Sequence, residues 1–305
     1  GMSARTRNEY RGALSSFAAW LEKNGRLLRN PFRTLPAANV KADRRRERRA
    51  LTPDEAGRLL YAARWRSLAE YGRDVVTAPK RPGKRASWTY RPLTVDDLPG
   101  AVARARERLA KHPEVIARLD AEGRERALLY RLMLYTGLRK NEAATLRIAD
   151  VRLDADPPCI RLRAENEKNR QGSTIPLRRD LAGAIREHLA GKARVITIGT
   201  APADEPVFDV PAGLLRVFDR DLAVAGIEKR DGSGRTVDLH ALRHTAATWL
   251  SRARVPAKVA QEVMRHSTVG MTLGVYTHAG LADMAEAVEA LPGLEGGPDG
   301  DAATL

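Results

Sequence analysis

Met264-Arg265-His266-Ser267 is followed three residues later by Met271-Thr272-Leu273-Gly274-Val275-Tyr276. Two other segments precede this stretch, His240-Ala241-Leu242-Arg243 and Thr136-Gly137-Leu138-Arg139-Lys140-Asn141-Glu142. Among their residues, Arg139 and Arg243 supply two guanidinium groups, His240 and His266 two imidazoles, and Tyr276 a phenol. Cationic groups of this kind can hold a phosphodiester while a tyrosine attacks its phosphorus. Each segment taken alone is a weak signal of such chemistry.

His240 and Arg243 are three residues apart on a predicted helix, so their side chains share one face. Taken alone, this pair is more typical of a capped helix with a surface arginine. His244 follows His240 at zinc-pair spacing, but Ala241 stands where zinc peptidases carry glutamate, and no third ligand is apparent nearby. The sequence predicts no metal site and no cofactor.

Arg139 and Glu142 repeat the same spacing on another predicted helix, after the turn at Thr136-Gly137. A carboxylate beside an arginine can fix the orientation of the guanidinium group. The alternative is a surface ion pair, which contributes less than about 1 kcal/mol to stability.

Lys168 lies between two predicted strands, at 157–165 and 173–177. A lysine in such a turn is usually solvated, but a positive site lowers its pKa and lets it deliver a proton. Tyr276 ends a predicted helix, where a tyrosine is often a packing residue. Because the ordinary pKa of a tyrosine is about 10, a nucleophilic role requires nearby positive charge or a base.

The charge of the chain favours polyanionic partners. Lys+Arg number 53 against 38 Asp+Glu, which gives a formal net charge of +15. Nucleic acid is the leading partner class, and a merely solvated basic surface is the alternative. Arginine predominates, and its planar fork of donors matches phosphate oxygens in pairs. We predict DNA contacts in the basic run at Arg44, Arg45, Arg46, Arg48 and Arg49.

Three further features limit the class of protein. The single Cys159 excludes an intrachain disulfide and a cysteine-rich zinc site. No window approaches the roughly 20 apolar residues of a membrane-spanning helix, and no apolar signal core is present at the N-terminus. We therefore expect a cytoplasmic, nucleoid-associated protein.

The apolar pattern predicts a mainly α fold with a small antiparallel β-sheet, in the α+β sense. Thr52 is the expected N-cap of a helix, with Pro53 at the first helical position and Glu55 completing a capping box. An N-terminal helix is expected over 3–28, with apolar residues spaced by three and four at Tyr10, Leu14, Phe17, Ala18 and Leu21. Further helices are expected at 101–119, 124–135, 179–190, 213–225, 239–253, 257–265, 269–276 and 281–291.

The motifs resemble those of the tyrosine recombinase (phage integrase) family. Members carry an Arg in a T-G-L-R-x-x-E segment, a Lys in a β-hairpin, an H-x-x-R pair, a His or Trp, and a Tyr, in that order. The matching residues here are Arg139, Lys168, His240, Arg243, His266 and Tyr276, with Glu142 at the acidic position. The resemblance is clear over 126–280 and weaker over 3–35. Arg265 stands where the family usually has glycine, which is expected to alter the local backbone but to keep the imidazole of His266.

The resemblance implies a site-specific recombinase that cleaves and rejoins double-stranded DNA through a 3′-phosphotyrosyl link, without metal or ATP. Tyr276 would be the nucleophile, and Arg139 and Arg243 would grip the non-bridging oxygens. Lys168 would protonate the leaving oxygen. His240 would take the tyrosine proton, and His266 would bond a phosphate oxygen.

The resemblance also implies domains: a partial N-terminal DNA-clamp region at 1–35, a basic linker at 36–50, and a catalytic domain at 51–291. An insertion of unknown role is expected at about 64–125, and a disordered tail at 292–305. A helix at 281–291 would link protomers in a tetramer on DNA or pack on its own domain. A type IB topoisomerase-like enzyme and a non-catalytic DNA-binding accessory protein are the alternative functions.

Overall fold

The computed structural model describes residues 1–40, 42–43, 45, 47–78, 87–167, 169–193, 202–270 and 272. The chain divides into two compact units. The first consists of Gly1–Arg49 and Arg230–Thr236, and the second of Ala50–Lys229 and Val237–Leu305. None of the described helices is long and apolar enough to cross a membrane.

The first unit is built on helix α1 (Ala4–Lys23), whose N-cap Ser3 accepts a hydrogen bond from the amide of Thr6. The apolar stripe expected of this helix is present but mostly uncovered. Phe17 is 59% exposed and stacks on Trp20, which is 52% exposed, whereas Ala18 is buried. The reason is that α1 is the single helix in the described part of this unit. The segment that follows it is held by polar contacts, such as the paired hydrogen bonds of Asn8 with Ala38.

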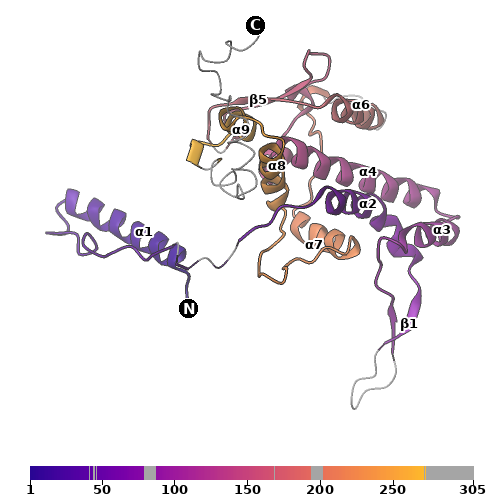
Figure 1. Cartoon of the computed structure of the whole chain (residues 1–305), viewed down its shortest axis with the longest axis horizontal. Coiled ribbons are helices and arrows are strands. Elements are labelled where there is room, and N and C mark those ends of the chain that lie inside the picture. Colours follow the sequence, from indigo (N-terminus) through magenta and orange to yellow (C-terminus); the bar gives the residue numbers. More distant parts are fainter. Residues whose placement is uncertain are drawn as a thin grey trace, which may run out of the picture. The chain divides into compact units, whose positions relative to one another are not determined.

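Helices form most of the second unit (Figure 1). They are α2 (Pro53–Ala69), α3 (Leu98–Arg108), α4 (Pro113–Thr136), α5 (Lys140–Ala144), α6 (Arg179–Ala193), α7 (Leu214–Val224), α8 (Ala241–Arg252) and α9 (Ala257–Met264). Short 3-10 turns lie at Glu70–Gly72, Ile148–Asp150 and Pro202–Asp204. The mainly α prediction is confirmed. The helices expected at 269–276 and 281–291 and the expected tail at 292–305 lie wholly or mainly outside the described residues.

The expected capping box at the start of α2 is confirmed. Thr52 Oγ1 accepts from the amide of Glu55 at 3.1 Å, and the Glu55 carboxylate accepts from the amide of Thr52 at 2.9 Å. The same end of α2 is tied to α8, because the amide of Leu51 donates to the hydroxyl of Thr245 and Trp249 Nε1 donates to the carbonyl of Leu51. These contacts help to fix α8, which carries Arg243.

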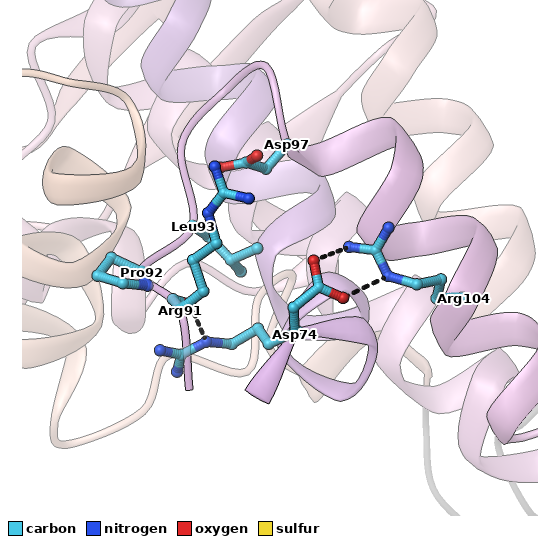
Figure 2. A pocket seen from close by; sticks show the side chains of 7 residues that line it. Asp74, Arg91, Pro92, Leu93, Asp97 and Arg104 are labelled. Atoms are coloured by element: carbon cyan, nitrogen blue, oxygen red, sulfur yellow. Dashed lines mark hydrogen bonds and ion pairs between the residues drawn. The ribbon is translucent and has the colours of Figure 1, made fainter. Parts of the chain in front are cut away.

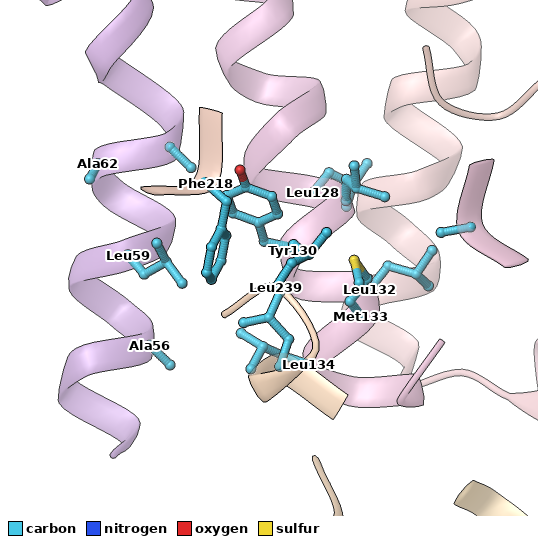
Figure 3. Close-up of a cluster of buried hydrophobic side chains, with 14 of the residues drawn as sticks. Ala56, Leu59, Ala62, Leu128, Tyr130, Leu132, Met133, Leu134, Phe218 and Leu239 are labelled. Carbon is cyan, nitrogen blue, oxygen red and sulfur yellow. The ribbon is translucent and has the colours of Figure 1, made fainter. Parts of the chain in front are cut away.

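The core lies between α2, α4 and α7 (Figure 3). Leu59 of α2, Tyr130 of α4 and Phe218 of α7 are fully buried, and the rings of Tyr130 and Phe218 meet edge to face with centroids 5.3 Å apart. Helices α2 and α4 approach closely at Gly123, where a Cβ atom would lie 2.1 Å from the carbonyl oxygen of Arg64. Gly123 is therefore required for this spacing.

A buried polar cluster lies at the same helix junction. Asp221 is fully buried and accepts hydrogen bonds from Arg66 Nε at 2.6 Å and from the Tyr130 hydroxyl at 2.9 Å. Arg126 Nε lies 3.2 Å from the same carboxylate. Burial first, and then the charge of Asp221, raise the pKa of Tyr130, so this hydroxyl stays protonated and donates. The cluster joins α2, α4 and α7 through one carboxylate.

The segment between α2 and α4 contains a β-hairpin and α3. Helix α2 continues to Ala69 and α4 begins at Pro113, so residues 70–112 connect them, and the insertion expected at about 64–125 stays a prediction. Strands β1 (Val75–Thr77) and β2 (Trp88–Tyr90) pair antiparallel. Figure 2 shows the base of this hairpin, where Arg104 of α3 bonds the carboxylate of Asp74. These contacts fix the hairpin to α3.

A second antiparallel sheet has the strand order β3-β4-β5, with β3 at Val151–Arg152, β4 at Cys159–Leu162 and β5 at Ser173–Pro176. The two expected strands are β4 and β5, which are shorter than predicted, and β3 was not anticipated. Ile160 pairs with Ile175, and both side chains are buried. This strand pairing therefore fixes where the β4–β5 connection, which contains position 168, leaves and rejoins the sheet.

Candidate active site

The site is organised around the turn that ends α4. Thr136 is its last helical residue, and Gly137 follows in the left-handed conformation with a φ of 61°. A Cβ at Gly137 would lie 2.8 Å from Cε of Met264, so this position is restricted both by conformation and by space. The turn delivers Arg139 to the start of α5.

Arg139 and Glu142 form a partly buried pair, not a surface pair. The amide of Arg139 donates to Glu142 Oε2 at 2.9 Å, and its Nη1 donates to Oε1 at 2.5 Å. The Glu142 side chain is only 2% exposed. Burial opposes its ionisation, but the hydrogen bonds from Arg139 and the charge of Arg265 outweigh this and lower the pKa of Glu142. The carboxylate therefore fixes the guanidinium of Arg139.

Arg243 is presented by α8 and is 4% exposed. Its two terminal nitrogens donate to the carbonyls of Gly137 and Met264. Burial, followed by the charges of Arg139 and Arg265, lowers the pKa of Arg243 to about 9. The group thus stays charged at neutral pH in a positively charged environment. It joins α8 to the turn before Arg139 and to the end of α9.

His266 follows α9, with its Nδ1 3.0 Å from the hydroxyl of Thr272. Burial lowers its pKa to about 4, assisted by the charges of Arg243, Arg139, Arg265 and His240. At neutral pH the imidazole is therefore uncharged. If the Thr272 hydroxyl donates to Nδ1, the proton of the ring lies on Nε2, which can then donate to a phosphate oxygen.

His240 occupies the N-cap position of α8 and is exposed. The helix begins two residues later than expected, and the carboxylate of Asp238 accepts from the amide of its first residue, Ala241, at 3.0 Å. The charge of His240 acts on the pKa of His266, so the two imidazoles belong to one electrostatic site.

Lys168 and Tyr276 lie outside the described residues, so their placement stays a prediction. Both sequence neighbours of Lys168 are described. Glu167 is buried and accepts from the Ser173 hydroxyl at 2.8 Å, and Asn169 Nδ2 donates to the carbonyl of Arg265 at 3.1 Å. The chain on either side of position 168 is thus attached to the site or to its own hairpin.

Arg265 is the site residue whose role the sequence did not reveal. It is 7% exposed and has a left-handed φ of 53°. Its guanidinium donates to Glu142 Oε2 at 3.2 Å and lies 3.7 Å from Glu167 Oε1. The one sequence signal was an arginine in place of a glycine at a helix end. Its burial depends on residues that lie far away in the chain.

The basic run belongs to the first unit, and Arg44 and Arg46 lie outside the described residues. Arg45 bonds the carboxylate of Asp43 at 2.8 Å and the carbonyl of Gly1 at 2.7 Å. Arg49 Nε lies 3.9 Å from the carboxylate of Asp231, and Arg48 forms a parallel β-bridge with Thr236. The described arginines thus make contacts within their own unit, and their role in DNA binding stays a prediction.

The described cluster has an excess of positive charge. The guanidinium groups of Arg139, Arg243 and Arg265 face the two carboxylates of Glu142 and Glu167. An anion placed beside Arg139 and His266 would complete the charge balance, and preorganised donors of this kind are suited to the oxygens of a phosphoryl group.

Comparison with known proteins agrees with this chemistry. The model of the Phage integrase family matches residues 107–282, more than half of the chain. Tyrosine recombinase XerD of Corynebacterium glutamicum is 28% identical over 298 residues, which cover 91% of this chain and 88% of that protein. Tyrosine recombinase XerD of Bifidobacterium longum is 28% identical over 295 residues, covering 91% and 88%.

Solved structures share the fold. The XerH site-specific recombinase in its post-cleavage complex with a palindromic difH substrate has a TM-score of 0.57 at 18% identity, covering 95% of this chain and 68% of that one. The Tn1549 transposon integrase in complex with transposon right end DNA also has a TM-score of 0.57 at 18% identity, covering 95% and 80%. Neither a topoisomerase-like enzyme nor an accessory protein is favoured by these likenesses. The chain therefore belongs to the phage integrase family and is a tyrosine-type site-specific recombinase.

Proposed function

We propose that Tyr276 cleaves one strand of a DNA duplex and that Arg139, Arg243, Lys168, His240 and His266 assist it. The observation that supports this assignment is that Arg243 bonds the turn that precedes Arg139, and that the charges of both arginines act on His266. Arg139 precedes Arg243 and His266 by more than a hundred residues in the chain. A phosphate beside them would meet donors already held in place.

The proposed reaction exchanges one phosphodiester for another. The Tyr276 oxygen attacks the phosphorus and loses its proton to His240, while the bond to the 5′-oxygen breaks and Lys168 gives that oxygen a proton. A 3′-phosphotyrosyl link results. The 5′-hydroxyl of a second strand reverses the step, so the DNA is rejoined without an external energy source.

Arg139 and Arg243 would stabilise the charge that builds on the non-bridging oxygens in the transition state. Each such preorganised donor is worth about 3–4 kcal/mol. His266 would donate from Nε2 to one of these oxygens. Its lowered pKa keeps it neutral at pH 7, so it would act as a hydrogen-bond donor and not as an added cation.

Double-stranded DNA is the proposed substrate, and the nucleoid is the proposed site of action. XerH and the Tn1549 integrase, which share this fold, were both solved bound to DNA. The net charge of +15 supports the same partner through attraction to phosphates. Two duplexes must be held together for strands to be exchanged, so we also propose that a tetramer acts on DNA. The arginines of the basic run would contact the phosphate backbone.

A pool of nicked duplexes with randomised sequence tests the assignment of Tyr276. A nick close to the cleavage point releases a short fragment and traps the protein on the DNA. The wild-type protein is expected to form a complex that resists SDS, and the trapped DNA gives the site by sequencing. Tyr276→Phe is expected to bind the recovered duplex but to trap none. Covalent DNA on Tyr276→Phe would show that another residue is the nucleophile.

A further inference from the structure

The Arg265 side chain lies inside the site and connects several of its segments, and it is not part of the surface charge. Its guanidinium donates to the carbonyls of Thr136 and Gly137 at 3.2 and 3.3 Å, on the turn that ends α4. It donates to Glu142 at 3.2 Å, the carboxylate that also holds Arg139. One planar group therefore grips both the backbone and the acidic side chain of the segment that presents Arg139.

A second set of contacts joins Arg265 to the β4–β5 connection. Arg265 Nε lies 3.7 Å from Glu167 Oε1, an ion pair too long to be a hydrogen bond. The backbone carbonyl of Arg265 accepts from Asn169 Nδ2 at 3.1 Å. These two contacts fall on the immediate neighbours of Lys168 in the chain, one on each side.

The third connection is covalent, because His266 is the next residue. The left-handed conformation of Arg265, with a φ of 53°, ends α9 and sets the direction in which His266 leaves the helix. The conformation is one that glycine adopts without strain and arginine does not. The contacts of the buried guanidinium offset that cost.

We infer that Arg265 is a positioning residue that sets the relative placement of Arg139, the Lys168 segment and His266 for strand cleavage. Its guanidinium acts through Glu142 and Glu167 and needs no contact with DNA. The inference rests on the proposed roles of Arg139, Lys168 and His266. Lysine could not replace the arginine fully, because a single ammonium group cannot reproduce the planar fork that spans these acceptors.

Three variants test the inference in the full chain. Arg265→Gly removes the side chain and suits the left-handed backbone, while Arg265→Lys keeps the charge. Arg254→Gly is the matched control, since Arg254 is exposed and has a left-handed φ of 54°. It removes the same charge and makes the same change of residue type.

Hydrogen exchange of the DNA-free proteins measures the connection without any reaction. Arg265→Gly is expected to speed exchange in the 136–145 turn and in the 163–173 connection together, and Arg254→Gly in neither. Faster exchange confined to the residues next to 265 would overturn the inference. If Arg265→Gly does not unfold cooperatively, the hydrogen exchange of Arg265→Lys is compared with that of Arg254→Gly, and this comparison tests the inference.

Cleavage of the nicked duplex recovered with the wild-type protein gives the second readout. The rate of covalent trapping at saturating protein is expected to fall about 100-fold for Arg265→Gly and about tenfold for Arg265→Lys, because small misplacements cost rates of this order. The affinity for that duplex should match that of Arg254→Gly. A trapping rate within threefold of wild type for Arg265→Gly would also refute the inference. If the wild-type protein traps no DNA, the proposed function fails, and the exchange data still decide the positioning role.

Discussion

Arg243 donates a hydrogen bond from its guanidinium to the backbone carbonyl of Gly137, across 106 positions of sequence. The contact ties α8 to the end of α4, immediately before the residues that present Arg139. A second hydrogen bond from Arg243 reaches the carbonyl of Met264, so the same side chain also fixes the end of α9. Arg243 therefore builds the site in addition to its proposed contact with phosphate.

Loss of either arginine is expected to suppress cleavage. Arg139→Ala and Arg243→Ala should each slow covalent trapping on the nicked duplex at least about 100-fold, because each removes a preorganised donor. Arg243→Ala should also lower the free energy of unfolding, since two backbone carbonyls lose a buried donor. Arg106→Ala, an exposed change on α3, is the control. A trapping rate for Arg243→Ala within threefold of wild type would contradict its proposed role.

The lowered pKa of His266 makes stability depend on pH. The folded pKa is about 4 and the ordinary value is 6.5, so between these values the unfolded chain binds a proton that the folded protein does not. The contribution of His266 to the free energy of unfolding should therefore be fully present above this window and be lost as the pH drops through it. Melting temperatures at pH 7 and pH 5 check this. The decrease in melting temperature from pH 7 to pH 5 should be smaller for His266→Gln than for wild type. Equal decreases would argue against a lowered pKa of His266.

Asp221 is expected to be the most sensitive acidic residue of the core. Asp221→Asn would leave Arg66 and Arg126 buried without their shared counter-charge, at a cost of about 3–5 kcal/mol in the free energy of unfolding. Asp219→Asn on the same helix disrupts a solvent-exposed pair with Lys229 and should cost less than about 1 kcal/mol. Urea titration of both variants gives the comparison, and similar losses for the two would refute the buried-cluster account.

The close approach of α2 and α4 predicts opposite effects for two glycines. Gly123→Ala would place a methyl group 2.1 Å from a backbone carbonyl oxygen of α2, so the helices must separate, which should cost about 1–3 kcal/mol. Gly57→Ala meets nothing within 4 Å on α2 and should stabilise the protein by about 0.5–1 kcal/mol. Chemical denaturation measures both. A stabilising Gly123→Ala would mean that the helices can readjust freely.

Local sequence signals were sufficient where neighbouring residues decide the structure. The capping box at Thr52 and Glu55 formed as predicted, because both partners lie within one helical turn. The strands around Ile160 and Ile175 were also found, although their ends were not. By contrast, the apolar spacing in α1 predicted a helix but not the surroundings of its apolar side chains, and Phe17 and Trp20 are exposed. Periodicity shows that a face is apolar and cannot show whether another element covers it.

The order of Arg139, Lys168, His240, Arg243, His266 and Tyr276 was enough to identify the family and the type of reaction, because the order of such groups is itself a property of the chain. Tertiary structure alone decided that Glu142 is buried, that Arg243 bonds Gly137, and that Arg265 joins two loops. Each of these contacts spans residues brought together only by packing. Burial changes the pKa of an ionisable group and the strength of its interactions with other charges, and burial is a property of the folded chain.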